Sequence, residues 1–224
     1  MDTHGRRRRY GLDGAAAVRP GHRARKGDET LGLLTPCPEI TGVVLVEPEV
    51  HADDRGAFLE TYRREWFPAG HEMVQGNRAM RHAGAVVGLH YHLRQADYWY
   101  VTSGHARVVL HDLREGSPTE GATLQLDAGE VDGASHNHLG IYIPPGVAHG
   151  FAALTELSLD YLVDGYYDPA DEHGVAWDDP EIGAQWAVTS PVLSERDRAN
   201  PRRAFLPAAL RPQAPALGPG SAPA

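Results

Sequence analysis

Hydrophobic and polar positions alternate over short stretches of this chain, and turn residues separate the stretches. The alternation is clearest in GVVLVEPEV (42–50) and ARVVLHDL (106–113). Successive side chains of a β-strand point to opposite faces, so the pattern predicts strands with one buried face and one face that is wet or lines a cavity. Nine segments read this way: residues 42–50, 57–62, 84–92, 98–101, 106–113, 122–126, 139–143, 149–154 and 157–163.

Helical periodicity is weak in the same region. It predicts a helix over residues 65–72 and a second over 194–199, where Ser194 is a suitable N-cap. Many short strands with frequent turn signals and few helices are typical of an antiparallel barrel or sandwich. We therefore expect an all-β protein.

The composition changes at both ends of the chain. Residues 1–32 mix Arg, Gly and Ala and include the run Arg6–Arg9, while residues 207–224 are dominated by Pro, Ala and Gly. Neither segment has a periodic apolar face to bury, so we expect two disordered, dispensable tails. One folded domain is expected between them, over residues 33–206.

Charge and hydropathy narrow the class of partners. The chain of 224 residues has a net charge of −9, and residues 1–30 carry eight Lys/Arg against four Asp/Glu, so the remainder is strongly acidic. Phosphate binding needs clustered basic side chains, which argues against nucleic acid as a partner. No stretch approaches the roughly 18 apolar residues of a membrane span, and there is no signal peptide, so we expect a cytoplasmic protein. The single cysteine, Cys37, excludes an intramolecular disulfide.

The densest group of chemically active residues lies in GAVVGLHYHLRQADYWYVTSG (84–104). His90 and His92 are two residues apart on a predicted strand and so share a face. Asp97 lies beyond a predicted turn, and His149 follows a Pro-Pro-Gly turn. Three imidazoles and a carboxylate could hold a divalent metal such as Fe, Mn, Zn or Ni. Their spacing resembles the two motifs of the cupin superfamily, with Asp97 in place of the usual Glu.

Seven segments in order resemble the dTDP-4-dehydrorhamnose 3,5-epimerase family of that superfamily. They are DDRGAFLETY (53–62), VQGN (74–77), GLHYH (88–92), DLREGSPT (112–119), IPPGVAHGF (143–151), GYYDPADEHGVAWDDPEIG (165–183) and VLSERD (192–197). The resemblance covers about residues 36–205. It implies a cupin-type antiparallel β-barrel (jelly roll) with short peripheral helices, no cofactor, and a nucleotide-linked 4-keto sugar as substrate.

The resemblance also implies roles for individual residues. In this family a base removes a proton beside the ketone, an enolate forms, and an acid returns a proton to the opposite face. By position, His90 is the implied base, Asp179 of WDDP the carboxylate that orients it, and Tyr161 the acid. The residues implied to bind nucleotide and sugar are Arg55, Glu60, Gln75, Asn77 and His149.

Three positions depart from the family pattern. Val87 stands where the family has Arg, His92 where it has Gln, and Asp97 at or beside the Lys that stabilises the enolate. An anion in place of a cation about 4 Å from an enolate reverses an interaction of roughly 4 kcal/mol at an effective dielectric near 20. Two alternatives therefore stay open. One is a metal-dependent cupin enzyme that uses His90, His92, Asp97 and His149, and the other is a non-catalytic barrel that binds a sugar nucleotide.

The resemblance implies a homodimer as well. We expect the strand within residues 42–50 to pair across the subunit interface, because such pairing would cover an exposed sheet edge.

Overall fold

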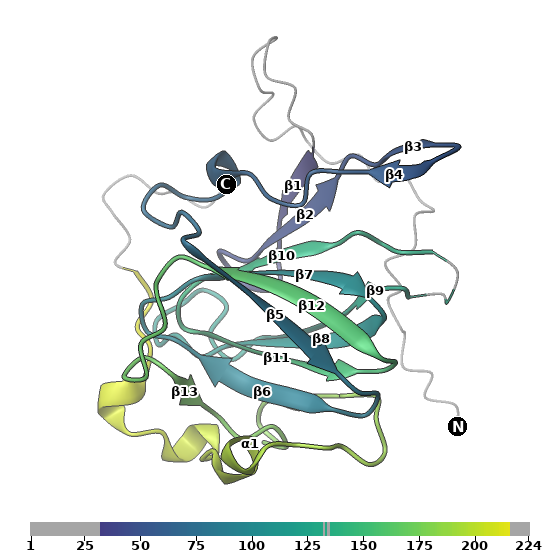
Figure 1. Cartoon of the computed structure of the whole chain (residues 1–224). Coiled ribbons are helices and arrows are strands. Elements are labelled where there is room, and N and C mark those ends of the chain that lie inside the picture. Colours follow the sequence, from purple (N-terminus) through teal and green to yellow (C-terminus); the bar gives the residue numbers. More distant parts are fainter. Residues whose placement is uncertain (1–31, 132, 134, 216–224) are drawn as a thin grey trace, which may run out of the picture. The chain divides into compact units, whose positions relative to one another are not determined.

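Two large antiparallel β-sheets form the body of the described part of the chain (Figure 1). The computed structural model describes residues 32–131, 133 and 135–215. The first sheet has the order β1 (Gly32–Pro36), β2 (Val44–Pro48), β10 (Gly140–Ile143), β7 (Asp97–Ser103), β12 (Leu157–Val163) and β5 (Gln75–Arg81). The second has the order β13 (His173–Gly174), β6 (Val86–Tyr91), β11 (Val147–Ala153), β8 (His105–Asp112) and β9 (Thr123–Gly129).

The remaining elements are short. Strands β3 (His51–Asp53) and β4 (Gly56–Phe58) form a separate hairpin. One α-helix, α1 (Glu195–Ala199), and three 3-10 turns, η1 (Arg64–Trp66), η2 (Arg203–Phe205) and η3 (Ala208–Leu210), complete the described elements. Among the described residues, no helix has the length and apolar character needed to cross a membrane.

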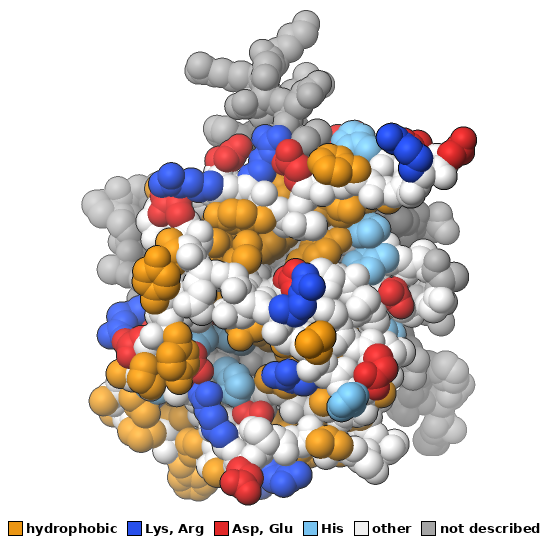
Figure 2. Space-filling model, viewed as in Figure 1, with side chains coloured by type: hydrophobic (Ala, Val, Ile, Leu, Met, Phe, Trp, Pro, Cys, Tyr) orange, Lys and Arg blue, Asp and Glu red, His pale blue; other side chains and the backbone are white. Residues whose placement is uncertain are grey.

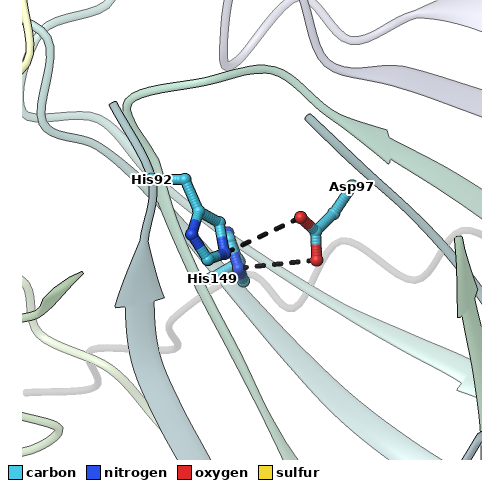
Figure 3. A group of neighbouring side chains, drawn as sticks. All are labelled: His92, Asp97 and His149. Carbon is cyan, nitrogen blue, oxygen red and sulfur yellow. Dashed lines mark ion pairs between the residues drawn. The ribbon is translucent and has the colours of Figure 1, made fainter. Parts of the chain in front are cut away.

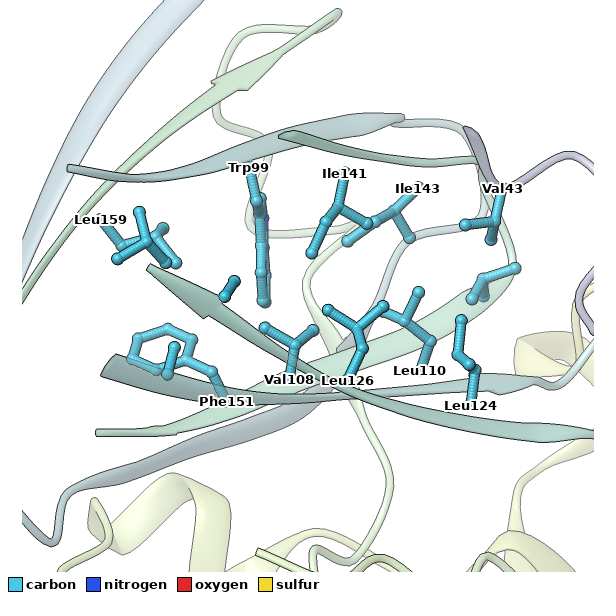
Figure 4. Packing of buried hydrophobic residues seen from close by; sticks show 14 of the residues in the cluster. Val43, Trp99, Val108, Leu110, Leu124, Leu126, Ile141, Ile143, Phe151 and Leu159 are labelled. Carbon is cyan, nitrogen blue, oxygen red and sulfur yellow. The ribbon is translucent and has the colours of Figure 1, made fainter. Parts of the chain in front are cut away.

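The main core lies between the two sheets (Figure 4). Trp99, Ile141 and Leu159 extend into it from the first sheet, and Leu110 and Phe151 from the second. Full burial of such a side chain contributes about 1.5–3 kcal/mol, so the alternating inner positions hold the sheets together. The predicted all-β antiparallel fold is confirmed.

Residues between Val175 and Leu206 cover the outer face of the second sheet. Outward residues of this sheet, such as Leu89 and Val109, pack with Val175, Ile182 and Trp186 in a second core cluster. The second sheet is therefore buried on both faces, which explains why β11 is buried at every position.

All nine predicted strand segments overlap observed strands, but the predicted helix over 65–72 is reduced to η1. Phe67 precedes Pro68 and is extended, because a residue before proline avoids the helical region. The second predicted helix is confirmed as α1, where the Ser194 side chain accepts a hydrogen bond from the Asp197 backbone N–H.

The strand expected to pair across a subunit interface has no free edge. Strand β2 lies between β1 and β10 and is hydrogen-bonded to both. The prediction that residues 42–50 cover an exposed edge is therefore wrong, and β1 is the edge strand on this side of the sheet.

The C-terminal boundary also needs correction. Residues 207–215 were expected to be disordered, but the Tyr91 hydroxyl donates to the Leu210 carbonyl at 2.9 Å, and Glu115 exchanges backbone hydrogen bonds with Pro212 and Ala214. The composition did not reveal this segment because hydrogen bonds attach most of it, and Pro212 is its one buried residue within 207–215. The rest of both predicted tails lies outside the described residues, apart from Gly32, the first residue of β1.

A buried ion pair predicts how stability depends on pH. The Arg114 guanidinium donates to both oxygens of Asp112, at 2.7 and 2.8 Å, and to the Thr41 carbonyl. Burial, the largest influence, raises the pKa of Asp112, but hydrogen bonds from Arg114, Ser117 and Thr119 together hold that pKa below its ordinary value. The carboxylate therefore stabilises the fold above about pH 4, and this stabilisation is lost as pH falls through the folded pKa.

We expect Asp112→Asn to lower the free energy of unfolding at pH 7 by about 3–5 kcal/mol, because Arg114 would remain buried without its counter-charge. Urea unfolding at pH 7 and at pH 3 measures this, and the difference from the wild type should shrink at pH 3. Asp53→Asn is the control, since Asp53 also binds an arginine but is exposed. Equal effects of the two substitutions would contradict the assignment.

Candidate active site

His90 on β6 lies directly opposite His149 on the neighbouring antiparallel strand β11. Directly paired residues share a face, and Phe151, two residues beyond His149, belongs to the inner core. Both imidazoles therefore lie on the inner face of the second sheet. The strands approach closely here because residue 88 is glycine, with a φ of +102°; a Cβ atom would lie 2.7 Å from the His149 carbonyl oxygen.

A buried carboxylate orients His90. The Nε2 atom of His90 lies 2.6 Å from Oδ1 of Asp197, in helix α1. Burial is the largest influence on Asp197 and raises its pKa, but the hydrogen bond and charge of His90, together with hydrogen bonds to Ser194 and Gly88, outweigh it, and the pKa is lowered. An ionised Asp197 keeps the proton on Nε2, which leaves the Nδ1 lone pair free to act as a base.

Asp179 does not orient the His90 imidazole. Its Oδ1 accepts from the Glu181 N–H at 2.9 Å, and its Oδ2 from the Arg203 N–H at 2.6 Å. The prediction that Asp179 orients His90 is corrected to Asp197. The Ser194 N-cap fixes the backbone at Asp197, but this local signal does not show which side chain Asp197 reaches.

The first sheet supplies the opposite wall. Tyr161 on β12 pairs with Trp99 on one side and Asn77 on the other. Val163 pairs in the same way with Asp97 and Gln75. All these side chains consequently share the face of Trp99, which points into the core. The predicted residues Tyr161, Gln75 and Asn77 are thus on the inner face.

Burial is the main cause that raises the pKa of Tyr161, and the negative charges of Asp97 and Glu172 add to it. The phenol is therefore protonated at neutral pH, as a proton donor must be. Beside it, Gln75 donates through its side-chain amide to the Asn77 side-chain oxygen at 3.1 Å. This fixes two polar groups next to the phenol.

Three of the four predicted metal ligands come together in Figure 3: His92, Asp97 and His149. The Nε2 atoms of His92 and His149 each lie 3.8 Å from an oxygen of Asp97, and all three side chains are buried. Within the described residues, these three form the group of His, Cys, Asp or Glu side chains that could hold a metal ion. His90, the fourth, is bonded to Asp197 instead.

Two predicted binding residues lie away from these side chains. Arg55 is in the β3–β4 hairpin, its side chain is 90% exposed, and it binds Asp53. Glu60 forms an ion pair with Arg63. The hairpin projects away from the two sheets (Figure 1). On the face shown in Figure 2, acidic and basic side chains are interspersed rather than gathered by sign.

Comparison with known proteins identifies the family. The family model described as dTDP-4-dehydrorhamnose 3,5-epimerase matches residues 38–204. The enzyme of that name from Pseudomonas aeruginosa is 40% identical over 167 residues, which cover 71% of this chain and 90% of the relative. A dTDP-4-dehydrorhamnose 3-epimerase from Streptomyces niveus is 37% identical, over 71% of this chain and 78% of its own.

Solved structures agree with these relatives. A 4-keto-6-deoxy sugar epimerase from the novobiocin gene cluster of Streptomyces spheroides has a TM-score of 0.74 at 33% identity, covering 86% of this chain and 98% of its own. A dTDP-6-deoxy-D-glucose-3,5-epimerase from Legionella pneumophila, solved with dTDP-4-keto-L-rhamnose, has a TM-score of 0.74 at 28% identity, covering 83% and 100%. The predicted cupin-type β-barrel is confirmed, and the chain belongs to the dTDP-4-dehydrorhamnose 3,5-epimerase family.

Proposed function

We propose that this chain epimerises a dTDP-linked 4-keto-6-deoxy sugar in deoxysugar biosynthesis. Family membership supports this function over the two alternatives from the sequence, a metal-dependent cupin enzyme with a different reaction and a non-catalytic barrel. The observation that carries the proposal is the bond between His90 and the buried Asp197, which gives an imidazole a free Nδ1 lone pair inside the barrel.

The two proton-transfer groups face each other across the barrel, as the inversion of a carbon centre requires. His90 belongs to the second sheet and Tyr161 to the first, so the two proton-transfer groups are on facing walls. A proton taken by His90 Nδ1 from the carbon beside the ketone leaves an enolate between them, and Tyr161 then donates its phenolic proton to the other face. Both proton transfers are assigned to side chains, so the proposal includes no organic cofactor.

The test follows dTDP-4-keto-6-deoxyglucose by NMR in D2O. Signals of the protons next to the ketone should disappear and those of an epimer should appear when the protein is added. A sugar nucleotide that binds but neither exchanges nor changes configuration would contradict the proposal and favour the non-catalytic barrel.

The substrate site is proposed to include Gln75, Asn77 and His149 from one chain and Arg55 and Glu60 from a second. The first three belong to strands that line the barrel, whereas the other two lie on or next to the projecting β3–β4 hairpin. A homodimer in which each hairpin reaches the partner's barrel would bring these residues together.

Light scattering at micromolar concentration should therefore give twice the chain mass of 24.3 kDa.

In such a dimer Arg55→Ala should raise KM about tenfold or more, because a charge-assisted hydrogen bond to a phosphate contributes roughly 1.5–3 kcal/mol. Arg64→Ala is the control, since Arg64 is also exposed and paired with an acid, Glu72. A monomeric mass would rule out the dimer.

A further inference from the structure

We infer that His92, Asp97 and His149 bind one divalent transition-metal ion beside His90, and that this ion stabilises the enolate. The second part rests on the proposed function, whereas the first part does not. The site is built from β7, β11 and the residue that directly follows β6 (Figure 3).

Hydrogen bonds fix which nitrogen of each ring faces Asp97. His92 Nδ1 lies 2.9 Å from the Asp171 carbonyl, and His149 Nδ1 lies 2.9 Å from the Val147 carbonyl. A carbonyl oxygen only accepts, so Nδ1 carries the proton in both rings. The Nε2 atom of each neutral ring is then a lone-pair donor, the form in which histidine ligates a metal.

Three lone-pair atoms therefore converge without a proton donor between them. The 3.8 Å between each Nε2 and its Asp97 oxygen is longer than a hydrogen bond. Lone pairs that face a carboxylate in a buried site repel it, and a cation between them turns the repulsion into attraction.

Neutral groups hold the Asp97 carboxylate in place. The Gln95 side-chain amide donates to Oδ1 at 3.0 Å, and the Trp99 indole donates to Oδ2 at 3.1 Å. Such supporting bonds to a buried carboxylate and to the far nitrogen of each imidazole are typical of metal ligands. They orient the carboxylate but do not balance its charge. The single lysine of the chain, Lys26, lies outside the described residues.

The three side chains would have to move inward to reach the ligand spacing of a first-row ion. The three ligand atoms lie within 4.8 Å of one another. A tetrahedral ion with bonds of about 2.1 Å would bring them to about 3.4 Å. Two imidazoles and one carboxylate are a ligand set that favours Fe, Mn, Co, Ni or Zn and leaves positions open for water or a substrate oxygen.

The position suits a role in the proposed reaction. His149 pairs with the base His90, and Trp99, which bonds to Asp97, pairs with the acid Tyr161. Without an ion, the negative Asp97 would repel an enolate formed between these residues. A divalent ion changes the sign of the local charge to positive, and so it supplies the attraction that a lysine at this place would give.

Binding of the metal alone tests the site. Protein made without an affinity tag is stripped with a chelator and titrated with Co²⁺, followed by its visible absorption, and with Zn²⁺ by calorimetry. We expect one ion per chain and at least 100-fold weaker binding in Asp97→Asn and His149→Gln. Binding in His90→Asn and His82→Asn should stay within threefold, since His90 is bonded to Asp197 and the His82 side chain is 96% exposed. Circular dichroism confirms that each variant is folded.

Deuterium exchange into the keto sugar, with and without Co²⁺, tests the role separately. The ion should accelerate exchange at least tenfold in the wild type and have no effect in Asp97→Asn. Wild-type protein that binds no stoichiometric ion, or Asp97→Asn that binds as tightly, would overturn the site. Unchanged exchange with bound ion would overturn the role in the reaction. Stoichiometric binding without exchange in any state would leave the metal site standing and remove the proposed function instead.

Discussion

Asp197→Asn is expected to lower kcat for epimerisation by about two to four orders of magnitude and to leave KM nearly unchanged. Asp197 holds the proton of His90 on Nε2 through a bond of 2.6 Å, so that Nδ1 keeps its lone pair. An asparagine amide can present its NH2 group to the ring and stabilise the tautomer that carries the proton on Nδ1. Loss of the correct tautomer in an Asp-His pair costs on the order of 10⁴ in kcat elsewhere.

Asp179→Asn is the matched control. Both aspartates are buried, but backbone N–H bonds from Glu181 and Arg203 account for both oxygens of Asp179. We expect this substitution to lower the free energy of unfolding by about 1–3 kcal/mol with little change in kcat. Steady-state kinetics and urea unfolding of both variants decide the matter. A larger loss of kcat in Asp179→Asn than in Asp197→Asn would contradict the geometry.

The strands that the sequence predicts well are those with one apolar face. Leu157–Val163 has this alternation and is observed with the predicted bounds. Strand β5 was missed because its inner positions include Gln75 and Asn77, which are polar since they face the site, while its outer positions are exposed. A polar inner face and a wet outer face give no alternation, so the pattern failed where the strand serves function.

The choice between two carboxylates was beyond the sequence. Asp179 and Asp197 both lie in segments that resemble the family, so the resemblance alone does not distinguish them. Which one reaches His90 depends on how the C-terminal segment runs along β6, through contacts such as the bond from the Val86 N–H to the Val192 carbonyl. These are long-range backbone contacts, and no local pattern encodes them.

The predicted set of metal ligands was too large for a related reason. The spacing of His90 and His92 predicts a shared face but not what each imidazole meets there. His92 lies near Asp97, whereas His90 is bonded to Asp197. The bond to Asp197 is a contact between residues far apart in the chain, and it separates the proton-transfer residue from the three possible ligands.

Solvent-deuterium exchange into dTDP-4-keto-6-deoxyglucose, compared between the wild type and His90→Asn, is the measurement that tests the central claim most directly. Tyr161→Phe serves as the matched variant, because Tyr161 acts only after the enolate has formed. Binding of dTDP, measured by calorimetry, should be equal in all three proteins and shows that the barrel is intact.

We predict that the wild type incorporates deuterium and that His90→Asn lowers the exchange rate at least a hundredfold, since a positioned base contributes about 10²–10⁴ in rate. Tyr161→Phe should keep exchanging while the yield of epimer falls. Exchange in His90→Asn at the wild-type rate would contradict the assignment of His90 as the base.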